Sequence, residues 1–387
     1  MIFQNKQNWK PTAIGEIAFE YSKRCDNPSN SGYDKFVGSE NIDRFDYKVK
    51  NWQSTDDVIS AMKLFEKDDY LLVRRSLYAS DFRERAPRAD FDGVCSGDIL
   101  TIKENQNKLA NGFLYCILNS KQVWEFIVAN ASGSITRRIK WPELSKLQIP
   151  LPPLEEQKQI AALFQSIETA MEQVDGQEKN LKALQKNLVN GLVTTKPVFG
   201  NLLNSKNCTP TNIGAIAECD KKYPEHEKEV ERFVGLEWIE ADNFQLQGFG
   251  LVANGTTFTK RFAKGDVLFG KRRAYLKKVA VADFDGICSG DILVIRAKAK
   301  KMLQGLLPYY ISAEAFINHA VSTSAGSLSP RTKWKDLETF EIAIPDLKTQ
   351  EKILEVLQQF DETIQQLKQQ KATLRLLKQK LLNEILG

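Results

Sequence analysis

The chain has 387 residues, with 54 Lys or Arg against 49 Asp or Glu, so its formal net charge is +5. This length predicts two or three domains, and no apolar run approaches the roughly 18 residues that a membrane span requires. The six cysteines form no C-x-x-C pair, only two histidines are present and the first residues lack a signal pattern, so we expect a cytoplasmic chain with no disulfide, metal, cofactor or membrane contact.

The sequence of residues 1–153 predicts a mixed α/β domain. Short β-rich runs bounded by Gly, Asp, Ser and Pro occur at residues 69–75, 98–103 and 147–152. Residues 111–130 instead carry apolar side chains at helical spacing, and we expect them to pack on the sheet. Cys95 is interpreted as a buried small residue, like its later counterpart Cys288.

A long helix is predicted over residues 154–196, after the Pro-rich stop IPLPPLEEQ. Its apolar residues keep a seven-residue step, and a second set follows three positions later, which is typical of a coiled-coil seam. A polar residue within the second set, Gln177, is expected to fix the register of the pairing. The first set is Ile160, Ile167, Val174, Leu181 and Leu188, and the second is Leu163, Ala170, Gln177 and Leu184.

Residues 197–346 repeat the first domain. The stretch ADFDGVCSGDILTIK at residues 89–103 recurs as ADFDGICSGDILVIR at residues 282–296, with 12 of 15 positions identical, and the same shift of 193 aligns residues 89–171 without a gap. Upstream of this region, the shift between the two copies is 197 at Phe36 and 199 at Pro11. The chain is therefore predicted to be a duplicated unit of about 190 residues. Some segments differ almost completely between the copies: 44–66 and 104–127 against 241–263 and 297–320.

Residues 347–387 repeat the long helix. Its seam is expected to comprise Ile353, Phe360, Leu367, Leu374 and Leu381, with Val356, Thr363, Gln370 and Leu377 three positions later. A seam of roughly 35 residues spans about 50 Å, which is longer than a domain of about 150 residues needs. We therefore expect the two helices to form an antiparallel coiled coil that separates two α/β heads related by a pseudo-two-fold axis.

Motifs of catalysis are missing from the sequence. It contains no phosphate loop, no dinucleotide-binding glycine motif, no H-E-x-x-H and no Asn-Pro-Pro or Asp-Pro-Pro motif. Repeated carboxylates could serve as catalytic groups of a decayed nuclease or methyltransferase, but Asp-Phe-Asp-Gly also makes an ordinary turn in which the aspartate caps its own backbone. We therefore interpret these carboxylates as scaffold and predict no catalytic residue in the chain. These carboxylates are Asp90, Asp92, Asp98, Asp283, Asp285 and Asp291.

Basic residues recur at equivalent positions of the two copies, near Tyr78 and Trp141 in the first and Tyr275 and Trp334 in the second. Cations beside an aromatic edge suit a surface that reads the DNA backbone and groove. The predicted DNA-contacting residues are Arg74, Arg75, Arg138 and Lys140 in the first copy, and Lys271, Arg272, Arg331 and Lys333 in the second.

The segment G-S…W…L…I-P-x-P-L-x-x-Q-x-x-I, which runs into each long helix, resembles the specificity subunit of type I restriction–modification systems. IPLPPLEEQKQIAALF from Ile149 matches closely, whereas IAIPDLKTQEKILEVL from Ile342 departs at Asp346 and at Lys348 and Thr349. The resemblance covers essentially the whole chain. It implies a non-catalytic subunit whose two target-recognition domains each read half of a split double-stranded DNA site, while the helices set the gap.

The same resemblance implies partner subunits: two copies of an adenine methyltransferase and two restriction subunits. Two alternatives stay open at this stage. The chain could be a specificity module for a fused restriction–methylation enzyme or a non-cleaving phage-defence methylase, or it could be a decayed enzyme that uses the repeated carboxylates.

Overall fold

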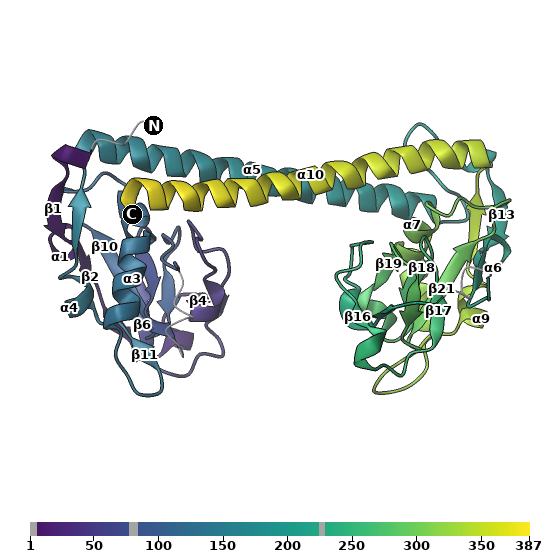
Figure 1. The fold of residues 1–387 in the computed structure, drawn as a ribbon, viewed down its shortest axis with the longest axis horizontal. Helices are drawn as coiled ribbons and strands as arrows, with labels where there is room; N and C mark the ends of the chain where they lie inside the picture. The colour runs from purple at the N-terminus through teal and green to yellow at the C-terminus, as the bar shows by residue number, and fades with distance from the viewer. Residues whose placement is uncertain (1–5, 77–83, 224–228) are drawn as a thin grey trace. The chain divides into compact units, whose positions relative to one another are not determined.

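The computed structural model describes residues 6–76, 84–223 and 229–387, which fall into two compact units (Figure 1). The first unit comprises Met1–Asp175 and Lys368–Gly387, and the second comprises Gly176–Leu367. Both long helices are divided between the units. The first unit therefore holds the start of α5 (Leu154–Leu192) and the end of α10 (Leu347–Leu386), and the second unit holds the rest of each.

Two sheets, of three and five strands, contain most of the strands that the structure describes in the head of the first unit, and β1–β12 and β8–β11 form two further two-stranded pairs. Strand β10 (Ile99–Glu104) lies between β2 (Ala18–Glu20) and β7 (Tyr70–Val73), and both pairings are antiparallel. The five-stranded sheet has the order β3-β6-β9-β4-β5, and its β4–β9 pair is parallel. The other strands are β1 (Lys10–Ala13), β3 (Lys23–Cys25), β4 (Lys35–Val37), β5 (Gln53–Ser54), β6 (Met62–Phe65), β8 (Arg75–Ser76), β9 (Gly93–Cys95), β11 (Arg137–Arg138) and β12 (Gln148–Leu151).

Short helices cover this head. The sequence predicted helical structure over residues 111–130, and the structure contains two helices there because the chain turns at Asn119. The Asn119 side chain accepts a hydrogen bond from the Ala86 N–H (3.2 Å) and donates one to the Ala86 carbonyl (3.1 Å), which pins the turn to a neighbouring segment. The helices are α1 (Ile14–Ile17), α2 (Phe113–Leu118), α3 (Lys121–Asn130) and α4 (Trp141–Leu144).

The second head repeats these pairings, as the duplicated sequence predicted. Strand β21 (Ile292–Ala297) lies between β14 (Ala217–Cys219) and β18 (Val267–Gly270), and β15 (Arg232–Val234) pairs parallel with β20 (Gly286–Cys288). The remaining elements are β13 (Thr209–Asn212), β16 (Gly250–Leu251), β17 (Lys260–Phe262), β19 (Val279–Val281), β22 (Glu341–Ile344), α6 (Ile213–Ile216), α7 (Leu307–Ser312), α8 (Glu314–Ser322) and α9 (Trp334–Leu337).

Cys95 and Cys288 are buried on the equivalent strands β9 and β20, as expected for small core residues. Burial raises the pKa of each thiol to about 12, so both stay protonated and unreactive at neutral pH. No helix among the described residues is long and apolar enough to cross a membrane.

Within each unit, α5 and α10 pair antiparallel. In the first unit, Glu168 and Asp175 of α5 contact Lys378 and Lys371 of α10 respectively, so residue numbers rise on one helix as they fall on the other. In the second unit, Gln185 of α5 donates to Asp361 of α10 over 2.7 Å. Among the predicted seam residues, Ile160, Ile167, Val174, Ile353 and Leu367 are buried, and Leu181, Leu188, Phe360, Leu374 and Leu381 are half-buried.

The second set of seam residues was predicted correctly only in part. Leu163, Ala170 and Val356 are half-buried, but Gln177 and Gln370 are exposed, as are Leu184, Thr363 and Leu377. The inward-facing positions come four residues after the first set and not three: Phe164, Met171, Glu178, Gln185 and Leu192 in α5, and Leu357, Ile364, Lys371, Lys378 and Ile385 in α10.

A buried glutamine fastens each head to its helix. The Gln157 side chain, 2% exposed, accepts a hydrogen bond from the Ala110 N–H (2.9 Å) and donates one to the Pro152 carbonyl (2.9 Å). Its counterpart Gln350 accepts from the Leu303 N–H (3.1 Å) and donates to the carbonyls of Lys301 and Pro345. The glutamine of the L-x-x-Q motif therefore joins helix to head.

Replacing Gln157 with Leu is expected to lower the free energy of unfolding by about 2 kcal/mol. The change keeps the side-chain volume but leaves the Ala110 N–H and the Pro152 carbonyl buried without this partner. Urea unfolding of the full chain measures the effect. Gln159→Leu on the exposed side of the same helix is the matched control, and equal losses for the two variants would contradict this role of Gln157.

Candidate nucleic-acid interface

Two arginines and one aspartate form a cluster in the first head. Strands β8 and β11 pair antiparallel, so Arg75 and Arg138 lie opposite each other. The Arg75 guanidinium donates to one carboxylate oxygen of Asp98 (2.7 Å), and the Arg138 guanidinium donates to the other (2.8 Å). Both arginine side chains remain about 40% exposed, so the cluster presents two oriented cations to solvent.

The second head contains the equivalent cluster. Arg331 donates to both carboxylate oxygens of Asp291, over 2.7 and 3.2 Å, and the Arg272 guanidinium lies 3.6 Å from the same carboxylate. Arg272 also donates to the Ser329 hydroxyl (3.0 Å). The structure thus brings together the predicted pairs Arg75 with Arg138 and Arg272 with Arg331. We call these two groups the Arg–Asp–Arg clusters.

The aspartates of the clusters are anions and not proton donors. Burial opposes ionisation of Asp98, but the hydrogen bonds from Arg138 and Arg75 outweigh it and lower its pKa. The hydrogen bond from Arg331 is the main cause of the lowered pKa of Asp291. The stabilisation from each cluster is therefore present above the ordinary aspartate pKa of 3.8 and is lost as the pH falls through the lowered value. This favours the scaffold interpretation over acid–base catalysis.

Each cluster braces a five-residue loop. In the first head, Ser132 and Arg138 exchange two backbone hydrogen bonds (3.1 and 2.9 Å) that close residues 133–137; in the second, Ala325 and Arg331 close residues 326–330 in the same way (3.0 and 2.9 Å). We call residues 133–137 and 326–330 the tip loops. Strand β11, which ends the first loop, lies at the end of its head far from α5 (Figure 1).

Each tip loop begins with a glycine in a backbone conformation that other residues rarely adopt. Gly133 has φ 137° and Gly326 has φ 112°. A Cβ at Gly133 would lie 2.0 Å from the Thr136 carbonyl oxygen, so no side chain fits there. This explains the glycine that the two copies share at this position.

The other predicted contact residues lie around the clusters without joining them. The backbone N–H groups of Arg74 and Lys271 donate to the backbone carbonyls of Asp98 and Asp291, each over 3.0 Å. Lys140 and Lys333 are exposed at the positions that precede α4 and α9. Tyr275 is 52% exposed, and Trp141 and Trp334 are half-buried against the core. Tyr78 lies outside the described residues.

Sequence reasoning missed two features of this surface. It interpreted Asp98 and Asp291 as scaffold, with a catalytic role as the alternative, and did not pair them with arginines, although their recurrence at the same offset as Arg138 and Arg331 was a usable sign of a shared cluster. It also left Arg273 out of the predicted contact residues, although the Arg273 side chain donates to the Leu328 carbonyl (3.3 Å) and links the second tip loop to the turn after β18. Arg273 has a left-handed backbone with φ 53°, a conformation uncommon outside glycine.

The turn residues of the Asp-Phe-Asp-Gly repeats have structural partners. Asp92 accepts a hydrogen bond from the Lys67 N–H (2.7 Å), and Asp285 accepts one from the Lys264 N–H (2.8 Å). Among the residues that the structure describes, no group of three or more His, Cys, Asp or Glu side chains is placed to hold a metal ion.

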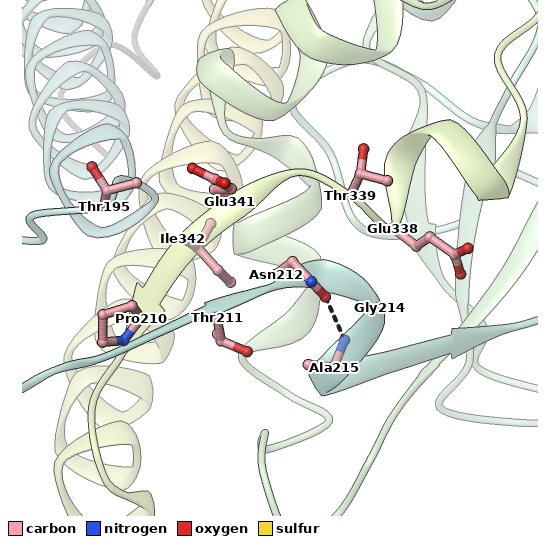
Figure 2. A pocket seen from close by; sticks show the side chains of 10 residues that line it. All are labelled: Thr195, Pro210, Thr211, Asn212, Gly214, Ala215, Glu338, Thr339, Glu341 and Ile342. Atoms are coloured by element: carbon pink, nitrogen blue, oxygen red, sulfur yellow. Dashed lines mark hydrogen bonds between the residues drawn. The ribbon is translucent and has the colours of Figure 1, made fainter.

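An open pocket of about 770 Å³ in the second unit lies between β13, the turn into α6 and β22 (Figure 2). Its lining includes the Glu338 and Glu341 carboxylates and three threonines, but no lysine, arginine or histidine. The Asn212 side chain there already accepts a hydrogen bond from the Ala215 N–H (2.9 Å) and caps α6. The pocket is thus made of scaffold elements, and its acidic lining does not suit a polyanion.

Comparisons with known proteins agree with this organisation. The model of the type I restriction modification DNA specificity domain matches residues 7–183 and 211–376. The putative type I restriction enzyme MjaX specificity subunit of Methanocaldococcus jannaschii is 24% identical over 92% of this chain and 90% of its own length. The type I restriction enzyme EcoDI specificity subunit of Escherichia coli is 30% identical over 27% of this chain and 23% of its own.

Two solved structures share the fold. One chain comes from a study of complex assembly and conformational transition of a type I R-M system; it covers 97% of this chain and 96% of its own length at 19% identity, with a TM-score of 0.55. The S subunit of a type I restriction–modification system from M. genitalium covers 98% and 96% at 16% identity, with a TM-score of 0.52. Since the family model matches one long segment in each repeat, the chain belongs to the type I restriction–modification DNA specificity family, as a specificity subunit with two copies of the specificity domain.

Proposed function

We propose that the two heads read the two halves of a split double-stranded DNA site and that α5 and α10 fix the gap between them. The observation that carries this proposal is the recurrence of the Arg–Asp–Arg cluster and its tip loop in two heads whose neighbouring segments differ almost completely. A shared basic frame suits the DNA backbone, which is the same everywhere, while differing segments suit two different base sequences.

The proposed division of labour follows from the chemistry of DNA. Arg75, Arg138, Arg272 and Arg331, with Arg74, Lys140, Lys271 and Lys333 around them, contact phosphates and position each head. Polar or arginine side chains from residues 44–66, 104–127, 241–263 and 297–320 read base edges in the major groove. Phosphate contacts release counterions, so the affinity falls steeply as the salt concentration rises. Half-sites about one helical turn apart, roughly 34 Å, lie on the same face of the DNA.

In this proposal the chain itself is not catalytic and works in the cytoplasm. Two adenine methyltransferase subunits bind along its helices and heads, and two restriction subunits complete the nuclease. The target adenine must leave the base stack to be methylated, and the methyltransferase can reach it only where this subunit has set the register. The names of the relatives, which are specificity subunits of type I restriction enzymes, support this assignment.

Adenine-methylation mapping by single-molecule sequencing tests the proposal. Cells that carry this gene beside its neighbouring methyltransferase gene should methylate a new motif of two short halves separated by a fixed gap, and cells without this gene should not. An unchanged methylation pattern, despite a soluble complex of the two proteins, would contradict the proposal. The proteins that copurify distinguish a type I system from a fused restriction–methylation enzyme or a non-cleaving methylase.

A further inference from the structure

Each tip loop carries an aliphatic side chain that is almost fully exposed to solvent. Ile135 is 83% exposed and Leu328 is 88% exposed, and the two residues are equivalent in the repeat. A single exposed apolar residue is ordinary on a protein surface. Recurrence at the same loop position in both heads points instead to a ligand that covers these side chains.

Hydrogen bonds brace the loop residues around these two side chains. Arg138 donates to the Thr136 hydroxyl (2.9 Å), next to Ile135. In the second loop, Leu328 is held through its carbonyl by Arg273 (3.3 Å), and the following Ser329 hydroxyl accepts from Arg272 (3.0 Å). An aliphatic side chain on a braced loop loses little conformational freedom when it inserts into a ligand.

The surroundings of the exposed side chains are cationic. Arg138 and Arg75 belong to the cluster that braces the first loop, and Arg331 and Arg272 to the one that braces the second. These guanidiniums oppose an apolar protein surface, since covering charged groups that are about 40% exposed would take them out of water, which is costly even for ion pairs. They suit a polyanion whose charge lies outside an apolar interior, which is the structure of duplex DNA.

We propose that Ile135 and Leu328 are apolar insertion points for DNA, each of which packs between adjacent base pairs of its half-site whatever their sequence. The inference rests on the proposed DNA-reading function. Because both heads carry the feature while their variable segments differ, the contact serves binding in general and not the choice of bases. Aliphatic side chains inserted between base steps unstack them partially and are flanked by cationic contacts to phosphate.

Serine substitution tests the insertion. Ile135→Ser and Leu328→Ser are compared with the conservative changes Ile135→Leu and Leu328→Ile, in the full chain copurified with its methyltransferase, on duplexes that carry the mapped site. The serine variants should bind about tenfold more weakly, and the conservative variants should stay within about twofold of the parent. The slope of affinity against salt should not change, because no phosphate contact is removed.

A 2-aminopurine probe placed at successive steps of each half-site reports unstacking directly. The parent complex should raise the probe's fluorescence at one step in each half, and each serine change should abolish the rise in one half only. Serine variants with unchanged affinity and fluorescence would overturn the insertion while leaving DNA reading intact. A loss confined to duplexes with thymine at one position would also overturn it, in favour of a contact to the thymine methyl group. Failure of the parent to bind the site would instead refute the proposed function.

Discussion

Replacing Lys378 with Ala is expected to lower the free energy of unfolding of the first unit by about 3–5 kcal/mol, the usual cost of removing one partner from a buried ion pair. The Lys378 and Glu168 side chains are only 2% and 5% exposed. Lys378 also donates to the Phe45 carbonyl (2.7 Å) and lies 4.9 Å from the centre of the Tyr115 ring. Its loss would leave a buried carboxylate without a cation, in surroundings too apolar to solvate it.

The second unit supplies a natural comparison for this pair. Gln185 and Asp361 occupy the positions equivalent to Lys378 and Glu168, so the same contact between α5 and α10 is made there with a neutral amide. Lys378→Gln copies this arrangement and should cost less than Lys378→Ala, because the amide still donates to the carboxylate. The double change Glu168→Leu with Lys378→Met should recover most of the loss, since no charge is then buried.

Denaturant unfolding of the full chain, followed by hydrogen exchange to assign the loss to the first unit, measures these differences. Lys380→Ala is the matched control, because that lysine lies on the same helix with a side chain 72% exposed. A Lys378→Ala variant no less stable than Lys380→Ala would show that the buried pair does not hold the helices together. Equal losses in the single and double variants would show that packing, and not charge, dominates the contact.

The same lysine explains why the helix seam was predicted only in part. A heptad pattern locates its second column by the apolar residues beside the first. In α10 the inward-facing column includes Lys371 and Lys378, while the apolar Leu377 next to Lys378 is 43% exposed. In α5, Gln185 faces inward and its neighbour Leu184 is 50% exposed. Both columns mix apolar and polar residues, so apolarity alone did not separate them, and the polar contacts of the inward-facing column are ones that a sequence does not pair.

The heads were more predictable, since the duplication allowed each copy to support the other. Strands such as β10 and β21 follow from β-branched runs between turn residues, and their identity across the copies excluded chance. Of the Arg–Asp–Arg clusters, only the cations were predicted. Arg75 and Arg138 lie far apart in sequence and meet only because β8 pairs with β11, a non-local pairing that composition does not specify.

Removing the aspartate of an Arg–Asp–Arg cluster is expected to have the largest effect on DNA binding. Whether the affinity rises or falls shows whether the arginines act by general attraction of phosphates or through positions that the aspartate fixes. Asp98→Ala removes a negative charge from a basic surface, so attraction of phosphates alone would tighten binding to any DNA. If the carboxylate positions Arg75 and Arg138, the same change should weaken specific binding about 10- to 100-fold, because two oriented guanidiniums and the tip loop lose their anchor. Asp291→Ala should act in the same way on the other half-site.

Affinities for a duplex with the full site, and for duplexes with one half scrambled, measure this prediction. Each aspartate variant should lose the preference for one half-site only, while its binding to unrelated DNA holds or rises. Asp26→Ala provides the same change of charge at a carboxylate that is 78% exposed and paired with a surface arginine, Arg24. Tighter binding of Asp98→Ala to every duplex, as for Asp26→Ala, would contradict positioning by the cluster. Loss of methylation with DNA affinity unchanged would instead give Asp98 a part in the chemistry, which its lowered pKa and its two arginine partners argue against.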